Sequence, residues 1–381
     1  MEKRLYTTVT IFGLIVLFIS VQIFSAHTQT VATNNLSKIS VQSLETIDML
    51  IFVSPQYSED MEVFSSILKY IESVKQDIGW NTEIVSIAKH ENDFLKIDQE
   101  IEQYYEQYKI KSCIMVGEDI DTVLSGDSDY MEKPSIIPWS TIGGESAYDI
   151  SPQGIVCKPY ATKICISLIY PTNTLEYQTK KSQIVFAFNK FSERQEYNLE
   201  NILICESSDI NKNSKYVYNS LNNLSKLEYF EDVTDEKMNF ILKKSYSSFF
   251  VHGHSNPSGT IINVQNKLWF SADFVDQIDT PIFGADGCYV NGWWSNSEDN
   301  NNLDLSINYT WYGDKIFSSE HVQVMALGLL SQTGYSYSVS FIETVFPSIS
   351  QAKTVAESVI DKPCLGDTIL IGDPTFHFSF N

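Results

Sequence analysis

The feature that most constrains the fold is a regular alternation of short apolar runs with longer amphipathic runs, which starts near residue 49. The short runs MLIFVSP, TEIVSIA and CIMVGED have the length and composition of buried strands. Between them lie MEVFSSILKYIESVKQDIG and FLKIDQEIEQYYEQYKI, whose apolar residues recur with the spacing of one helix face. Strands joined by helices in this way form a parallel sheet covered by helices. We therefore predict an α/β fold, and no Gly-rich loop follows these strands to bind a nucleotide.

A second alternation begins after an irregular segment at about 124–160. Its predicted strands are ICISLIYP, NILICESSD, YSSFFVHG, PIFGADGC, YSYSVSF and TILIGDPTFHFSF. Its predicted helices are LEYQTKKSQIVFAFNKFSE, most of LWFSADFVDQI, and HVQVMALGLLSQTG. The two halves share an architecture without sharing a sequence repeat, so we predict mostly parallel sheets flanked by helices in two α/β subdomains.

Composition excludes some classes of partner. Of the 381 residues, 43% are hydrophobic and 13% aromatic, which indicates globular structure. The chain carries 26 basic and 48 acidic side chains, a formal net charge of -22. Such a charge opposes non-specific binding to nucleic acid or to anionic membranes. We therefore expect no nucleic-acid partner.

The N-terminal segment has the pattern of an export signal or a membrane anchor. Lys3 and Arg4 precede an uncharged, mostly apolar stretch from Leu5 to Ala26. The stretch is long for a signal peptide and nearly long enough to span a bilayer, so both alternatives stay open for residues 1–27. A polar spacer at 28–45 follows. We expect the remainder to be extracellular or held at the outer face of the cytoplasmic membrane, with membrane contact only through this segment.

Two predicted strands end in residues that a core strand does not need. The run FFVHGHSNPSG places His252 and His254 where one strand meets a loop, and GADGC places Cys288 on a tight turn after another. Open α/β sheets build their sites at this carboxyl edge. A thiol there, with an imidazole close by, forms a nucleophile and base arrangement. The other cysteines show no metal-type spacing, and Cys113, Cys165 and Cys205 lie in apolar segments as core residues do.

These segments resemble the gingipain-type cysteine peptidases of the caspase-like clan. FFVHGHSNPSG is similar to that family's Gly-His-Gly segment, and GADGCYVNG to its Asn-Ala-Cys segment. TGYSYSVS is similar to the strand beyond the cysteine, and ILIGDPTFHF to the closing Gly-Asp-Pro motif. The resemblance implies a non-catalytic subdomain at 46–160 and a caspase-like catalytic subdomain at 161–381. It also implies an exported cysteine endopeptidase that acts on a protein or peptide substrate.

The resemblance assigns roles to individual residues. Cys288 is the expected nucleophile and His252 the expected base, because Gly253 follows it and can donate a backbone N–H to an oxyanion. His254 is the alternative base, and both histidines are expected on one strand face. Asp286 is either an orienting residue for the imidazole or a turn cap. No cofactor is required.

The loop beyond the cysteine carries two further expectations. Trp293 and Trp294 are candidates for the wall of a substrate cleft, with ordinary packing as the alternative reading. Asp299 and Asp304 lie in an acid- and amide-rich loop that is a candidate for structural Ca²⁺, with a solvated loop as the alternative.

Two other function classes stay open. A surface binding protein could keep the peptidase fold without its activity, because fold does not imply function. A metal-dependent hydrolase could use His252 and His254 as a ligand pair together with Asp286. The remaining histidines, at His27, His90, His321 and His377, form no recognisable metal motif.

Overall fold

The computed structural model covers the chain, and residues 46–381 form one compact unit. The residues that the structure describes are 46–87, 93–117, 123–124, 133–134, 136–143, 148–151, 154–157, 161–171, 176–208, 226–256, 259–263, 265–271, 274, 277–278, 280–286, 316, 325–329, 346–349, 351, 353–362 and 368–379. The predicted signal or anchor at 1–27 and the spacer at 28–45 lie outside them. Within the described ranges, no helix is long and apolar enough to cross a membrane.

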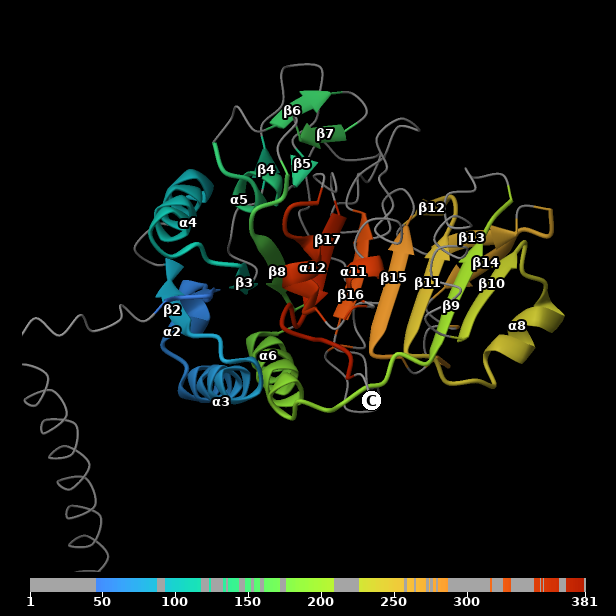
Figure 1. Cartoon of the computed structure of the whole chain (residues 1–381), viewed down its shortest axis with the longest axis horizontal. Coiled ribbons are helices and arrows are strands. Elements are labelled where there is room, and N and C mark those ends of the chain that lie inside the picture. Colours follow the sequence, from blue (N-terminus) through green and yellow to red (C-terminus); the bar gives the residue numbers. More distant parts are fainter. Residues whose placement is uncertain are drawn as a thin grey trace, which may run out of the picture. The chain divides into compact units, whose positions relative to one another are not determined.

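A ten-stranded sheet forms the centre of the described part of the chain (Figure 1). In sheet order its strands are β10 (Lys226–Glu231), β9 (Asn201–Glu206), β11 (Ser248–His252), β15 (Ile282–Asp286), β16 (Met325–Leu329), β17 (Thr368–Gly372), β8 (Cys165–Ile169), β3 (Ser112–Val116), β1 (Met49–Val53) and β2 (Thr82–Ser86). Small sheets are formed by β12 (Ser255–Asn256), β13 (Gly259–Asn263) and β14 (Leu268–Ser271), by β4 (Val123–Leu124) and β5 (Lys133–Pro134), and by β6 (Tyr148–Ser151) and β7 (Gly154–Cys157).

The large sheet contains two parallel halves that run in opposite directions. Strands β10, β9, β11, β15 and β16 are mutually parallel, and so are β17, β8, β3, β1 and β2. The halves meet where β16 pairs with β17 in antiparallel fashion. The carboxyl ends of the two halves therefore lie at opposite edges of one sheet. The division into subdomains at residue 160 stays a prediction, and the structure joins strands from both sides of it through the pairing of β3 with β8.

Helices cover this sheet. They are α2 (Pro55–Ser58), α3 (Met61–Ile78), α4 (Phe94–Tyr108), α5 (Ile137–Ser140), α6 (Tyr177–Ser192), α8 (Asp235–Ile241), α11 (Phe346–Ile349) and α12 (Val355–Val359). The Asp60 side chain caps the start of α3, and Gly79 ends that helix in the left-handed conformation with φ 75°. Helices α3 and α6 lie side by side (Figure 1). Apolar residues at helical spacing face the core from α3 (Val63, Ile67, Tyr70, Val74) and from α6 (Ile184, Ala187, Phe188, Phe191).

The first alternation is confirmed as a βαβαβ unit. Strands β1, β2 and β3 pair in parallel with β1 between the other two, and α3 and α4 connect them in sequence. In the second alternation, the predicted strands that end at Glu206, His252 and Asp286 are present as β9, β11 and β15. The mostly parallel α/β fold class is therefore confirmed.

Two predicted elements differ in the structure. Residues within HVQVMALGLLSQTG form β16 instead of a helix, because an apolar run in the middle of a covered sheet lacks the alternation that would mark a strand. The first residues of LWFSADFVDQI, which precede the predicted helix, form β14, which pairs with β13. The closing strand stops at Gly372, where φ is 122°, and a turn begins at Asp373. The predicted strand YSYSVSF lies outside the described residues.

Candidate active site

Three neighbouring parallel strands bring polar residues to one edge of the sheet. The register pairs His252 of β11 with Glu206 of β9 on one side and with Asp286 of β15 on the other. Each of the three is the last residue of its strand. Adjacent strands lie about 4.8 Å apart, so this row places three ionisable residue types next to one another at a carboxyl edge.

Glu206 and His252 form a buried pair at the centre of this row. The imidazole Nδ1 of His252 lies 2.9 Å from Oε1 of Glu206. Glu206 is 1% exposed and His252 is 7% exposed, so water does not screen the interaction. The backbone N–H of Ser207, which follows β9, donates to the carbonyl oxygen of His252 at 3.0 Å and fixes the ends of β9 and β11 relative to each other. A carboxylate held against one ring nitrogen sets the tautomer of the imidazole.

The second oxygen of Glu206 has a partner as well. The hydroxyl of Tyr229, on β10, donates to Oε2 of Glu206. Burial, together with the hydrogen bond to Glu206 and its negative charge, raises the pKa of the Tyr229 hydroxyl above its ordinary value. The hydroxyl therefore stays protonated and acts as a donor. Glu206 thus stands between a permanent donor and a titratable ring.

Aromatic packing fixes β11 beside β15 beneath these polar ends. Phe249 of β11 stacks on Phe283 of β15 with ring centroids 5.5 Å apart, and Phe270 of β14 covers both. Gly284 lies directly opposite Phe250, and a Cβ at Gly284 would collide with the Phe250 ring. The glycine in PIFGADG therefore permits close packing of the two strands that carry the site.

His252 and His254 occupy different environments. Strand β11 ends at His252, and Gly253 and His254 form a bend before β12 begins at Ser255. His252 is buried with Gly253, whereas His254 is exposed. The expectation that both rings share one strand face is wrong, because the strand does not continue past His252. The identity of the base and the oxyanion role of Gly253 stay predictions, with the geometry of His252 described above in its favour.

Several predicted site residues cannot be placed. Cys288, Trp293, Trp294, Asp299 and Asp304 lie outside the described residues, so the nucleophile, the cleft wall and the Ca²⁺ loop stay predictions. Asp286 is described for its backbone only, at the end of β15. Among the described residues, no group of three or more His, Cys, Asp or Glu side chains is arranged to hold a metal ion.

Cys113, Cys165 and Cys205 are buried core residues, as their apolar surroundings in the sequence predict. Burial raises the pKa of the Cys165 thiol to about 12 and also raises that of Cys113 and of Cys205. These thiols stay protonated at neutral pH, and a protonated thiol is a poor nucleophile. They are unsuited to the role predicted for Cys288.

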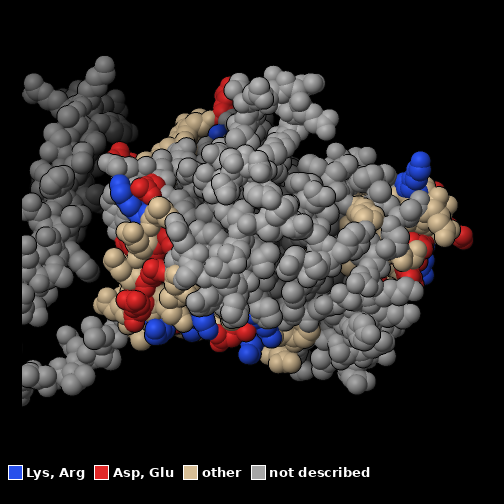
Figure 2. Space-filling view, turned by 90° about the horizontal axis from the view of Figure 1, so that it is seen from above, with Lys and Arg blue, Asp and Glu red and all other residues tan. Residues whose placement is uncertain are grey.

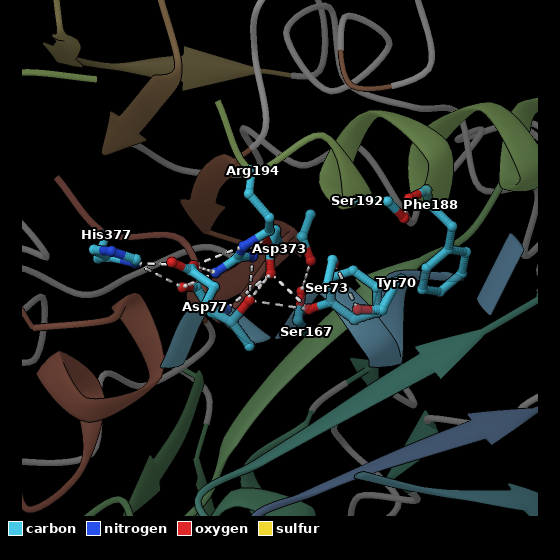
Figure 3. Close-up of polar contacts among 11 residues, drawn as sticks. Tyr70, Ser73, Asp77, Ser167, Phe188, Ser192, Arg194, Asp373 and His377 are labelled. Carbon is cyan, nitrogen blue, oxygen red and sulfur yellow. Dashed lines mark hydrogen bonds and ion pairs between the residues drawn. The ribbon is translucent and has the colours of Figure 1, made fainter. Parts of the chain in front are cut away.

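A second polar cluster lies at the opposite edge of the sheet, where the Gly-Asp-Pro segment follows β17 (Figure 3). Asp373, which is 3% exposed, accepts hydrogen bonds through Oδ1 from the Tyr70 hydroxyl at 2.6 Å and from the Thr375 backbone N–H at 2.9 Å. Its Oδ2 lies 2.9 Å from the guanidinium of Arg194. Arg194 also binds Asp77 on α3, with Nε 2.8 Å from Oδ2. This cluster ties α3, the end of α6 and β17 together.

Charged side chains on the described surface are mixed in sign. In the view of Figure 2, described Lys and Arg side chains and described Asp and Glu side chains both occur around the margin of the face. Ion pairs among the described residues include Lys181 with Asp60 at 3.0 Å and with Glu62 at 2.6 Å. Described side chains of both signs of charge are therefore present on this face.

Sequence reasoning missed Glu206 and Tyr229. Glu206 ends the apolar run NILICE just as His252 ends SFFVH, so the shared pattern of a polar residue after a buried strand was a usable signal. The pattern does not say which strands are neighbours, and only the order β9, β11, β15 brings Glu206 to His252. Tyr229 lies in KLEYFE, the strand β10 at the edge of the sheet. Its charged residues do not form the apolar run by which the other strands were predicted.

Comparisons with known proteins find likeness at the level of structure only. No protein-family model and no curated protein matches the sequence. The crystal structure of the Arg-specific cysteine proteinase gingipain R aligns with a TM-score of 0.53 and 14% identity over 89% of this chain and 79% of that one. A complex of the pro- and mature domains of RgpB from Porphyromonas gingivalis aligns with a TM-score of 0.55 and 14% identity, covering 87% and 79%. At this identity the likeness shows the fold, and the chain has a gingipain-like α/β fold.

Proposed function

We propose that this protein is an exported or membrane-anchored cysteine endopeptidase that cleaves peptide bonds through Cys288, His252 and Glu206. The observation that carries the proposal is the buried Glu206–His252 pair, with Nδ1 and Oε1 2.9 Å apart. It lies beside β15, whose last residue, Asp286, precedes Cys288 by two positions. The likeness to a cysteine proteinase fold supports the same function.

In the proposed mechanism, Glu206 orients the base. Its carboxylate accepts a hydrogen bond from the Nδ1–H of His252, so that Nε2 is the nitrogen that takes the proton from the Cys288 thiol. The negative charge of Glu206 also stabilises the imidazolium that this transfer creates. The sequence left Asp286 either as an orienting residue or as a turn cap, and the observed contact with His252 favours Glu206 for the orienting role.

The thiolate of Cys288 then attacks the peptide carbonyl carbon. The backbone N–H groups of Cys288 and Gly253 stabilise the oxyanion of the tetrahedral intermediate. The C–N bond breaks as His252 returns its proton to the leaving amine, and a thioester remains on Cys288. His252 next removes a proton from water, the hydroxide attacks the thioester, and the carboxylic acid and the thiol are released.

Thiol labelling combined with cleavage assays tests this proposal. The wild type is compared with Cys288→Ala, His252→Ala and His254→Ala in iodoacetamide labelling across about pH 5 to 9 and in cleavage of a peptide library. We expect labelling of Cys288 well below the ordinary thiol pKa, and we expect His252→Ala to abolish it together with cleavage while His254→Ala retains both. Buried Cys113 is an internal control for general thiol exposure.

Two outcomes would contradict the proposal. Slow labelling of Cys288 without cleavage, unchanged by either histidine substitution, would leave a binding protein on a peptidase fold. Loss of activity in His254→Ala alone would make His254 the base and remove Glu206 from the mechanism, because Glu206 contacts His252.

A further inference from the structure

Glu206 is held from both sides, and only one of its partners takes part in the proposed mechanism. Oε1 faces His252 at 2.9 Å and Oε2 accepts the Tyr229 hydroxyl. A carboxylate with one contact can rotate about its terminal torsion, since such sp³–sp² torsions are broad. Two contacts on opposite oxygens fix both the position and the plane of the carboxylate. The Tyr229 hydroxyl therefore restricts the direction in which Glu206 presents Oε1.

The place of Tyr229 in the sheet explains how it reaches Glu206. In the β9–β10 register Tyr229 pairs with Ile204, which lies two residues before Glu206 and so projects to the same face. The long phenol ring then extends along the strand toward the carboxyl edge. Glu231, at the end of β10, is the residue directly opposite Glu206.

The end of β10 is clamped against the end of β9. After β10, Asp232 has φ 51°, its backbone N–H donates to the Glu206 carbonyl at 2.9 Å, and its Oδ1 accepts from the Ser208 N–H at 3.0 Å. The side-chain amide of Asn263 on β13 donates to the carbonyl oxygens of Asp232 at 3.2 Å and Val233 at 3.0 Å. These contacts fix the strand that carries Tyr229 relative to Glu206.

We propose that Tyr229 is a positioning residue of the site, whose hydroxyl holds the Glu206 carboxylate in the orientation that engages His252 Nδ1. This inference rests on the proposed peptidase function and extends it beyond the cysteine, histidine and glutamate. The hydroxyl donates at every pH at which the peptidase would work, because burial and Glu206 keep its pKa high. It stabilises the ionised form of Glu206, which the imidazolium requires.

The test compares Tyr229→Phe with a matched control, Tyr246→Phe. Tyr246 is also buried, it lies two residues before the start of β11, and among the described residues its hydroxyl has no hydrogen-bond partner. Both substitutions remove one oxygen from a tyrosine near the same strand. Three quantities are measured on the full chain: the proton NMR signal of His252 Nδ1–H, the pH profile of kcat/KM for a cleaved peptide, and the urea unfolding midpoint.

We expect Tyr229→Phe to lower kcat/KM about ten- to 100-fold, the effect of losing one hydrogen bond to a charged group. The acid limb of the pH profile should move, because the contact between the Glu206 carboxylate and the His252 imidazole changes. The Nδ1–H signal should shift, and Tyr246→Phe should leave all three unchanged. A purely structural role for Tyr229 would lower the unfolding midpoint without moving the acid limb.

The outcomes separate this inference from the proposed function. If the wild type cleaves peptides and Tyr229→Phe keeps the wild-type pH profile and Nδ1–H signal, the inference is overturned while the peptidase function stands. If the wild type neither cleaves peptides nor shows an activated Cys288, the proposed function fails. An unchanged Nδ1–H signal in Tyr229→Phe would then overturn the positioning of Glu206 as well, and a shifted signal would support it.

Discussion

Two buried carboxylates stand at opposite edges of the same sheet, and their partners differ in kind. Asp373, after β17, is matched by the guanidinium of Arg194 and by the hydroxyls of Tyr70 and Thr375. Glu206, at the end of β9, is matched by the imidazole of His252 and the hydroxyl of Tyr229. Both carboxylates are almost fully buried, so neither can rely on water for its stabilisation.

The difference lies in whether the partner can lose its charge. Burial disfavours the charged form of Arg194, but Asp373 and Asp77 outweigh it and raise the pKa of the guanidinium, so Arg194 keeps its charge at all physiological pH values. An imidazole changes its charge within that range. The balance of charge around Asp373 is therefore permanent, whereas that around Glu206 depends on one proton. The first arrangement suits a structural anchor, and the second suits proton transfer.

The largest expected effect comes from Asp373→Asn. The amide would place a donor toward Arg194 or toward the Tyr70 and Thr375 donors, so a buried cation or buried hydroxyls lose their acceptor. Removing one member of a buried ion pair typically costs about 3–5 kcal/mol. We expect urea denaturation to show a fall in the free energy of unfolding of about that size. The specific activity of the folded fraction should stay close to that of the wild type.

A substitution that removes less of the network serves as the control. Arg194→Lys keeps a positive charge but cannot contact Asp373 and Asp77 together as the planar guanidinium does. It should lose clearly less stability than Asp373→Asn. Equal stability of Asp373→Asn and the wild type would show that the buried cluster is not an anchor.

Glu206→Gln should give the opposite pattern. Both partners can adapt to an amide, because the Tyr229 hydroxyl and a neutral imidazole can each donate or accept. We therefore expect the free energy of unfolding to change by no more than about 1.5 kcal/mol. The charge that stabilises the imidazolium is lost in any orientation, and we expect kcat/KM to fall at least about 100-fold, or about 2.7 kcal/mol of transition-state stabilisation.

Asp373→Asn and Glu206→Gln can be compared directly, because each replaces one carboxylate oxygen with a nitrogen. For both variants, kcat/KM is measured in a peptide cleavage assay and the free energy of unfolding is measured by urea denaturation. Glu206 would have a structural role like that of Asp373 if Glu206→Gln lowered the free energy of unfolding as much as Asp373→Asn does and its folded fraction kept full activity.

The sequence predicts which segments of this site form strands better than it predicts the order of those strands in the sheet. The apolar runs that end at His252 and Asp286 could be read directly, because each is short, bounded by glycine and followed by polar residues. Glu206 could be read as the end of a strand but not as a partner of His252, because strand order is set by packing between distant segments. The helix predicted over β16 failed since a short apolar run fits a buried helix and a buried strand equally well.

A third buried carboxylate extends the comparison to a case without a matching cation. Asp98 on α4 is 6% exposed, and among the described residues its Oδ1 has no hydrogen-bond partner. Burial, with a smaller contribution from Glu102 one turn away, raises the pKa of Asp98 from 3.8 to about 7. The fold therefore tolerates the Asp98 carboxylate mainly in its protonated form.

The smallest expected effect is therefore one that depends on pH. As the pH rises from about 4 to 7, the unfolded chain releases the Asp98 proton while the folded chain retains it, so stability falls across that window and the loss is complete above it. Asp98→Asn should remove the loss. We expect the variant to be clearly more stable than the wild type at about pH 8 and nearly equal to it at about pH 4, by urea denaturation. Glu106→Gln, at an exposed position of the same helix, should show no such crossover. A constant difference between Asp98→Asn and the wild type at all pH values would mean that Asp98 titrates alike in both states, and that the absence of a cation costs this carboxylate nothing.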